Sequence, residues 1–299
     1  MATTTKSPGW FHLLAAVTVI IWGTTFVSTK VLINNGLTPA DIFFYRFLLA
    51  YVCIWFVSPC KLLSRSWRDE LRFLGLGLSG GSLYFIAENT ALGLTFASNV
   101  SLIICTTPIL TAFLSLLIYK GERLRPRLIS GSLLALLGVV LVVFNGSFIL
   151  HLNPLGDLLT LLAALMWACY CLLLRRMNPH YDTLFITRKV FFYGLLTVLP
   201  LFAFHPLQLD ATVLFRPLVV VNLLFLGVVA SMLCYIMWNT AVKQLGAVRT
   251  ANYIYVVPLV TVLTSSLIID ETITVVSLIG SVLILGGVYL AERGLKFGK

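Results

Sequence analysis

The chain has 299 residues, of which 59% are apolar and only 11% carry a charged side chain. Soluble domains carry roughly 25% charged residues, so this composition excludes a water-soluble globular protein. The net charge of +10 comes from basic residues in short segments between apolar stretches. This pattern indicates membrane topology and argues against a nucleic-acid-binding surface.

Apolar stretches of about 20 residues recur along the whole chain, and each is long enough to cross the bilayer interior as a helix. The first stretch is too long for a signal peptide and is interpreted as a retained span. Short connections with turn residues and prolines separate the stretches, so we expect a single all-α membrane domain. The ten predicted transmembrane helices cover residues 11–33, 41–59, 71–93, 96–119, 127–145, 156–175, 184–204, 217–241, 247–269 and 273–292.

The distribution of basic residues predicts the orientation. With the N-terminus inside, all but three of the 21 Lys and Arg residues (Lys30, Arg46 and Arg216) face the cytoplasm. Because cytoplasmic loops of membrane proteins are rich in Lys and Arg, both termini are predicted to be cytoplasmic. We expect a multi-pass protein of the cell's inner (plasma) membrane.

An internal repeat divides the chain into two halves, residues 1–147 and 148–299, of five predicted helices each. The motif Asn89-Thr90-Ala91-Leu92 returns 150 residues later as Asn239-Thr240-Ala241-Val242. Since five is an odd number, the second half must cross the membrane in the opposite direction. Inverted repeats are typical of secondary transporters, whose substrate site lies near the membrane midplane. The other repeated positions are Pro108/Pro258, Glu122/Glu271, Gly131/Gly280 and Gly138/Gly287.

The first half resembles a known family. The residues that carry the resemblance are Ile21-Trp22-Gly23-Thr24-Thr25-Phe26, Arg46, Asn89-Thr90-Ala91-Leu92, Pro108, Glu122 and Gly131 through Gly138. They are similar to the EamA-type, ten-helix members of the drug/metabolite transporter superfamily, and the similarity extends over nearly the whole chain as two EamA-type repeats. It implies a central cavity lined by spans 1, 3, 4, 6, 8 and 9.

The resemblance and the inverted repeat together predict a secondary transporter. We expect it to move a small organic solute (an amino acid, a metabolite or a drug) across the inner membrane by alternating access, in the direction of export. Two alternatives remain open, a sugar-phosphate or nucleotide-type exchanger and a channel or lipid scramblase. The partners expected are the solute, the lipid bilayer and, as a candidate coupling ion, protons.

Glu88 is the one acidic residue that falls well inside a predicted span. A charge at the centre of a membrane helix costs on the order of 2.5–3.5 kcal/mol, so we expect Glu88 to face a wet cavity or a partner. Its candidate roles are binding of a substrate ammonium group or of a proton, and the alternative is a structural hydrogen bond. The other candidates for the substrate path are Tyr84, Asn99, Trp22, Trp167, Trp238, Asn252 and Tyr253.

Three basic residues near span ends are candidates for gating or for binding an anionic group: Arg46, Arg188 and Lys30. The alternative is that their long side chains reach the lipid headgroups. Pro108 and Pro258 fall in mid-span, where proline interrupts the helix, and are candidate hinges. The repeated Asn89 and Asn239 are expected to form structural hydrogen bonds between helices.

An enzyme is not expected, because no nucleophile and base, and no metal-ligand spacing, can be recognised. The four histidines (His12, His151, His180 and His205) are scattered at span ends and in loops. The cysteines lie in or beside apolar spans and are interpreted as small buried hydrophobic residues. We therefore expect neither a metal site nor a cofactor.

Overall fold

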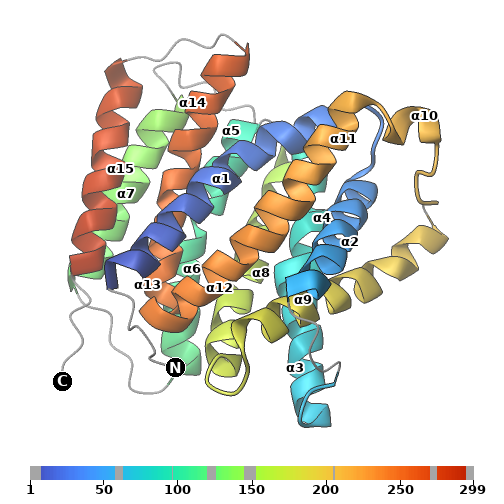
Figure 1. Ribbon diagram of the computed structural model, residues 1–299. Coiled ribbons are helices and arrows are strands. Elements are labelled where there is room, and N and C mark those ends of the chain that lie inside the picture. The colour runs from blue at the N-terminus through green and yellow to red at the C-terminus, as the bar shows by residue number, and fades with distance from the viewer. Residues whose placement is uncertain are drawn as a thin grey trace.

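The computed structural model describes residues 8–57, 63–95, 97–119, 126–144, 153–204, 206–269 and 275–293. All regular secondary structure in these residues is helical, and the helices form one bundle (Figure 1). The predicted repeat positions Glu122 and Glu271 lie outside the described residues.

In the first half of the chain, only the third and fourth predicted spans are divided into shorter helices. The segments are α1 (Pro8–Asn34), α2 (Pro39–Val57), α3 (Trp67–Gly77) with the π-helix η1 (Leu78–Ser82) and α4 (Leu83–Leu94), α5 (Ala97–Ile104) with α6 (Thr107–Ile118), and α7 (Pro126–Phe144).

The second half is interrupted at corresponding places. Its segments are α8 (Pro154–Met177), α9 (Thr183–Val198) with the 3₁₀ helix η2 (Leu199–Ala203), the short α10 (Ala211–Leu214), α11 (Pro217–Leu224) with the π-helix η3 (Phe225–Leu233) and α12 (Cys234–Leu245), α13 (Ala247–Ala251) with the 3₁₀ helix η4 (Asn252–Val256) and α14 (Val257–Ile269), and α15 (Val275–Arg293).

Seven helical segments in the described residues are long and apolar enough to cross a membrane, and parts of α7 and α15 form two shorter apolar helices. This confirms an all-helical, multi-pass membrane protein. The third predicted span, residues 71–93, is neither one of the seven long helices nor one of the two shorter ones. Its centre is polar, because η1 consists largely of Ser and Gly and α4 carries Glu88 and Asn89. Such polarity inside a span is typical of helices that line an interior site.

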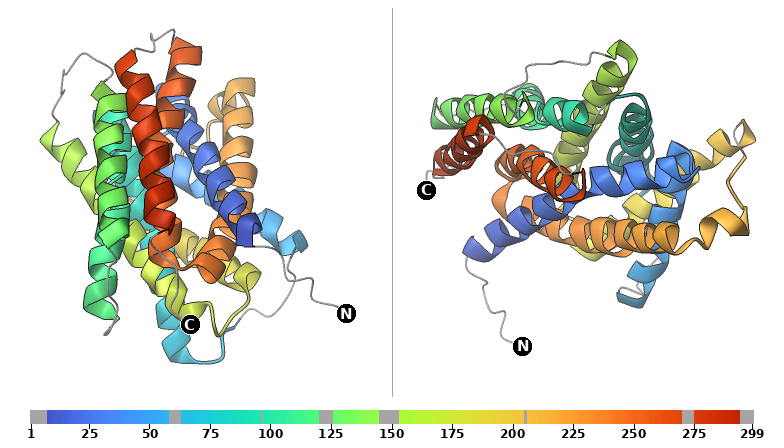
Figure 2. Two further views of the ribbon diagram at one scale, coloured as in Figure 1. Left: turned by 90° about the vertical axis from the view of Figure 1, so that its left-hand side faces the viewer. Right: turned by 90° about the horizontal axis from the view of Figure 1, so that it is seen from above.

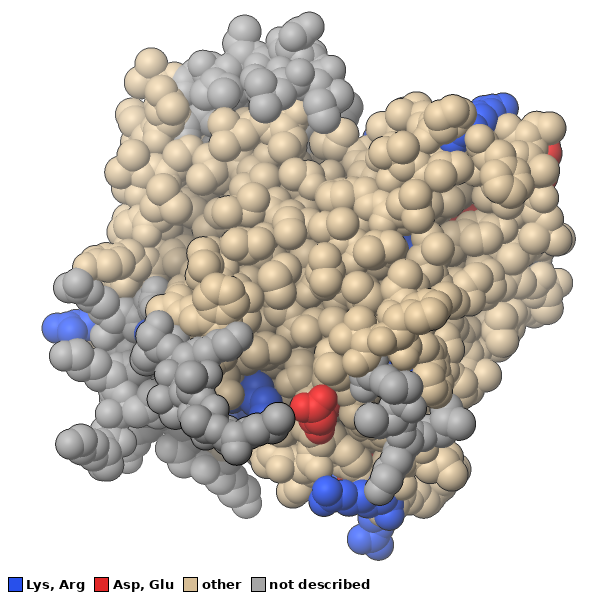
Figure 3. All heavy atoms as spheres, viewed as in Figure 1, with Lys and Arg blue, Asp and Glu red and all other residues tan. Residues whose placement is uncertain are grey.

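The outside of the bundle is apolar. Phe113, Leu117 and Val282 are 57–70% exposed, and in Figure 3 the face between the two ends of the bundle shows almost no charged side chains. Large apolar residues on a surface mark contact with something other than water. For a bundle with these helix lengths, that contact is the lipid.

Helices α7 and α15 lie side by side at one edge of the bundle (Figures 1 and 2). A side chain on Gly131 would lie 2.4 Å from the backbone nitrogen of Ala291, and one on Gly287 would lie 2.4 Å from that of Ala135. The small residues at these positions therefore allow close helix packing.

Both candidate hinge prolines follow a break in the helix. Pro108 lies in the first turn of α6, after the gap that separates it from α5, and Pro258 lies in the first turn of α14, directly after η4. Proline is accepted at these positions because the first turn needs no backbone N–H donor there.

Candidate functional site

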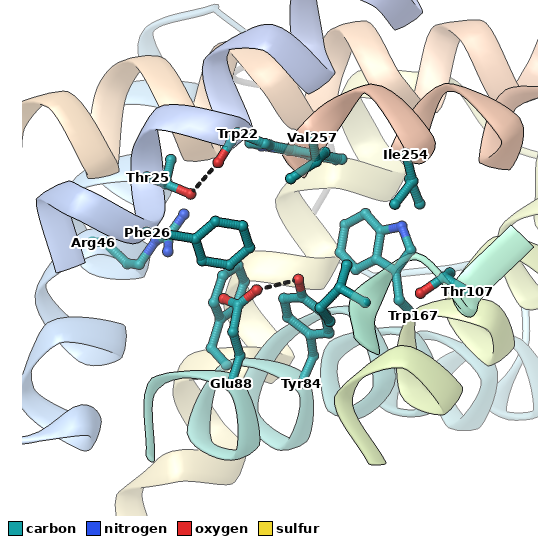
Figure 4. A pocket seen from close by; sticks show the side chains of 12 residues that line it. Trp22, Thr25, Phe26, Arg46, Tyr84, Glu88, Thr107, Trp167, Ile254 and Val257 are labelled. Carbon is teal, nitrogen blue, oxygen red and sulfur yellow. Dashed lines mark hydrogen bonds between the residues drawn. The ribbon is translucent and has the colours of Figure 1, made fainter. Parts of the chain in front are cut away.

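One pocket lies inside the bundle and takes its walls from both halves of the chain. It contains about 480 Å³ of space between atoms, a volume that includes the part open to solvent. Its lining comes from α1, α2, α4, α5, α6, α8, η4 and α14 (Figure 4): Trp22, Thr25, Phe26, Arg46, Tyr84, Phe85, Glu88, Ile104, Thr107, Trp167, Ile254 and Val257.

Arg46 brings a positive charge to this pocket from α2, although it is only 2% exposed. Its Nε donates a hydrogen bond to Ser231 Oγ at 3.0 Å, and its guanidinium carbon lies 4.1 Å from the centre of the Phe85 ring. Its terminal nitrogens make no hydrogen bond within the described part of the chain. The position is incompatible with a side chain that reaches the lipid headgroups, so this alternative is wrong for Arg46.

Glu88 brings a negative charge to the same pocket and is 6% exposed. Tyr84 lies one helical turn before it on α4, and the Tyr84 hydroxyl donates a hydrogen bond to Glu88 Oε1 at 2.5 Å. Among the described residues, no ion pair within 4.0 Å joins Glu88 to Arg46. Both charges therefore face the pocket without neutralising each other by direct contact.

Aromatic side chains form much of the remaining wall. The Trp22 and Trp167 rings meet edge to face at 5.1 Å, and Tyr84 lies 4.9 Å from Trp167. The Trp22 indole donates a hydrogen bond to the carbonyl oxygen of Ala230 at 3.0 Å. Ala230 lies within the π-helix η3, and π-helical turns are frequent at functional sites.

Five of the residues singled out in the sequence line the pocket: Trp22, Arg46, Tyr84, Glu88 and Trp167. The other substrate-path candidates lie outside its lining. Trp238 is buried behind Trp22, with the two ring centres 5.0 Å apart. The Tyr253 hydroxyl forms a hydrogen bond with His12 Nδ1 at 2.7 Å.

Asn99 and Asn252 are also outside the lining. Asn99 donates to Thr95 Oγ1 at 3.3 Å, and Asn252 is buried in η4. The two remaining charge candidates are held elsewhere in the bundle. Arg188 is buried against Trp55, 4.6 Å from the ring centre, and Lys30 donates to the carbonyl oxygen of Leu92 at 2.6 Å.

The repeated asparagines connect helices. The Asn89 amide donates to the carbonyl oxygen of Pro39 at 3.2 Å. Asn239 accepts a hydrogen bond from Tyr170 at 2.6 Å and donates one to Thr187 at 2.9 Å. Asn89 thus links α4 to α2, and Asn239 links α12 to α8 and α9.

Seven residues of the lining were not predicted from the sequence. Thr25 and Phe26 belong to the motif at 21–26, and Thr107 precedes Pro108, so proximity to a recognised motif could have indicated these three. Phe85, Ile104, Ile254 and Val257 carry no signal that separates them from lipid-facing or core residues. Within the described residues there is no cluster of His, Cys, Asp and Glu able to hold a metal ion.

Comparison with known proteins agrees with this architecture. The EamA-like transporter family matches residues 9–144 and, a second time, residues 154–292. The chain belongs to the EamA-like transporter family. Its members are transporters and not enzymes, and the two matches show that this EamA-like chain consists of duplicated halves.

Two relatives match over almost their full length. An uncharacterized transporter of Archaeoglobus fulgidus is 32% identical over 93% of this chain and 96% of its own. A protein of Escherichia coli described as a probable amino-acid metabolite efflux pump is 28% identical over 96% of each chain. A solved crystal structure with 20% identity superposes with a TM-score of 0.74 over 97% of this chain and 100% of its own, and supports the fold.

Proposed function

We propose that this EamA-like protein is a secondary carrier that binds a small zwitterionic metabolite, of the amino-acid type, in the pocket between Arg46 and Glu88. The main observation behind this proposal is that one buried pocket contains a guanidinium group and a carboxylate that do not form an ion pair with each other. The name of the Escherichia coli relative, a probable amino-acid metabolite efflux pump, points to the same class of solute.

The chemistry of the two charges matches the two ends of an amino acid. The planar guanidinium of Arg46 can donate two parallel hydrogen bonds to a carboxylate, and the free oxygen of Glu88 can accept one from an ammonium group. A zwitterion loses its hydration when it enters a buried site, so both of its charges need partners there. The aromatic wall then packs against the rest of the solute.

Alternating access by two inverted halves is the proposed transport mechanism. Both halves contribute to the pocket, and the breaks before Pro108 and Pro258, together with the π-helices η1 and η3, are places where the helices can bend. The basic residues favour a plasma-membrane protein with cytoplasmic termini, and the relative's name favours export.

Glu88 is also the proposed site of proton coupling. Once protonated, Glu88 no longer attracts an ammonium group, so a proton and the solute would compete for the same carboxylate. Outward movement of solute would then be exchanged for inward movement of a proton.

Transport by purified protein in proteoliposomes tests the proposal. We expect saturable uptake of labelled amino acids and acceleration when unlabelled amino acid is present on the other side of the membrane. Uptake that neither saturates nor shows this counterflow indicates a channel or scramblase. Competition by sugar phosphates but not by amino acids indicates the alternative exchanger.

A further inference from the structure

Two polar groups in the pocket wall have no hydrogen-bond partner in the described part of the chain. They are the indole N–H of Trp167 and the hydroxyl of Thr107. As whole residues, Trp167 is 4% exposed and Thr107 is 0% exposed. Both residues line the pocket. In Figure 4 they lie together on one side, with Tyr84 between them and the side that holds Arg46.

The other neutral polar groups of the pocket are satisfied within the protein. The Trp22 indole donates to the carbonyl oxygen of Ala230, Thr25 donates to the carbonyl oxygen of Trp22, and Tyr84 donates to Glu88. Buried polar groups in proteins almost always have a partner. The lack of one for Trp167 and Thr107 therefore needs a specific explanation.

We infer that Trp167 and Thr107 form a second polar subsite, which binds the far end of the transported solute. The inference rests on the proposed function and narrows its substrate class to amino acids whose side chain ends in a neutral hydrogen-bonding group. A side-chain amide fits both groups. Its carbonyl oxygen accepts from the Trp167 N–H, and its NH₂ group donates to the Thr107 hydroxyl, which can donate or accept.

The same subsite disfavours two kinds of side chain. An apolar one leaves both protein groups unpaired, which a site built for hydrogen bonding rejects strongly. A carboxylate would be buried there without a cation, since the pocket's one arginine lies on the other side of Tyr84. Asparagine, leucine and aspartate have side chains of similar shape, so they allow an amide, an apolar group and a carboxylate to be compared directly.

The experiment compares the affinities of asparagine, leucine and aspartate for the full-length protein in lipid nanodiscs. We expect asparagine to bind about 10–100-fold more tightly than leucine or aspartate, which is the net value of about two hydrogen bonds. Trp167→Phe keeps the aromatic ring and Thr107→Val keeps the shape. Each should reduce the preference for asparagine over leucine about tenfold, because each removes one hydrogen bond, and the affinity for leucine should not fall.

Trp22→Phe is the matched control, because the Trp22 N–H bonds the protein itself. It should change the affinities for asparagine and leucine by the same factor. Thermal unfolding of each variant shows whether it is folded. If amino acids bind but the affinities for asparagine and leucine are nearly equal, the subsite is refuted and the proposed function stands. The same conclusion follows if the preference for asparagine is unchanged in both Trp167→Phe and Thr107→Val. If no amino acid binds, the proposed function itself fails.

Discussion

Lys189 Nζ lies 2.8 Å from Oε1 and 2.9 Å from Oε2 of Glu70 and joins α9 to α3. The hydroxyl of Tyr193, one turn further along α9, donates to the same carboxylate, as does the backbone N–H of Ser64. The ion pair connects the two halves of the chain at the end of the bundle where α1 and α3 begin (Figure 1). Both side chains are largely shielded from water.

Replacement of Lys189 by Met should destabilise the protein by about 2–4 kcal/mol, because a shielded carboxylate loses its counter-charge. Thermal unfolding in detergent measures the loss. Arg72→Met is the control, since the Arg72–Asp69 pair is more exposed and should contribute less than about 1 kcal/mol. The double variant Glu70→Gln/Lys189→Met should recover part of the loss. A double variant no more stable than Lys189→Met would contradict a charge-based explanation.

The Glu70 carboxyl should also make stability depend on pH. Glu70 lies in the first turn of α3, ahead of the apolar part of that segment. Partial burial by itself raises its pKa, but the hydrogen bonds from Lys189, Tyr193 and Ser64 outweigh this effect and lower the pKa from 4.5 to about 2.

Because the folded-state pKa is lowered, the stabilisation is present above about pH 4.5 and is lost as the pH falls through about 2. The difference in melting temperature between the protein and Glu70→Gln should therefore be constant from pH 5 to 8 and shrink below about pH 4.5. If this difference in melting temperature is unchanged down to about pH 2, the charge on Glu70 is not the source of the stabilisation.

Removal of either pocket charge should impair transport. Arg46→Gln and Glu88→Gln should each lower the transport efficiency for an amino acid about 10–100-fold, because a hydrogen bond to a charged group contributes about 1.5–3 kcal/mol. Glu88→Gln should in addition abolish the pH dependence of transport. Initial rates in proteoliposomes at several pH values measure both effects.

The control for the pocket variants is Arg216→Gln, because Arg216 lies at the start of α11 and outside the pocket lining. This variant should transport the amino acid at the normal rate. Transport by Glu88→Gln with unchanged rate and unchanged pH dependence would restrict Glu88 to a structural role.

Two adjacent glycines of α15 should respond differently to the same substitution. Gly287→Ala would place a methyl group 2.4 Å from the backbone nitrogen of Ala135 on α7, whereas Gly286→Ala meets nothing within 4 Å. We expect Gly287→Ala to destabilise the protein by about 1–3 kcal/mol through overpacking. Gly286→Ala should be neutral or stabilising by up to about 1 kcal/mol. Equal melting temperatures would show that α7 and α15 can separate without cost.

The sequence by itself determined the helical membrane architecture and the duplication, because both depend on the order of residues along the chain. A bilayer requires long apolar helices, and the repeat of Asn89 and Pro108 as Asn239 and Pro258 is visible as spacing. Glu88 could be selected for the same reason, since a charge inside an apolar stretch is conspicuous without any structure.

Only the tertiary structure decided which polar residues meet. Arg46 and Arg188 look alike in the sequence, yet Arg46 enters the pocket while Arg188 is buried against Trp55. Trp167 and Trp238 are both tryptophans within spans, but only Trp167 lines the pocket. The rotation of each helix about its own axis selects the side chains that face inward, and that rotation depends on contacts with helices far away in the sequence. A single sequence does not contain those contacts in readable form.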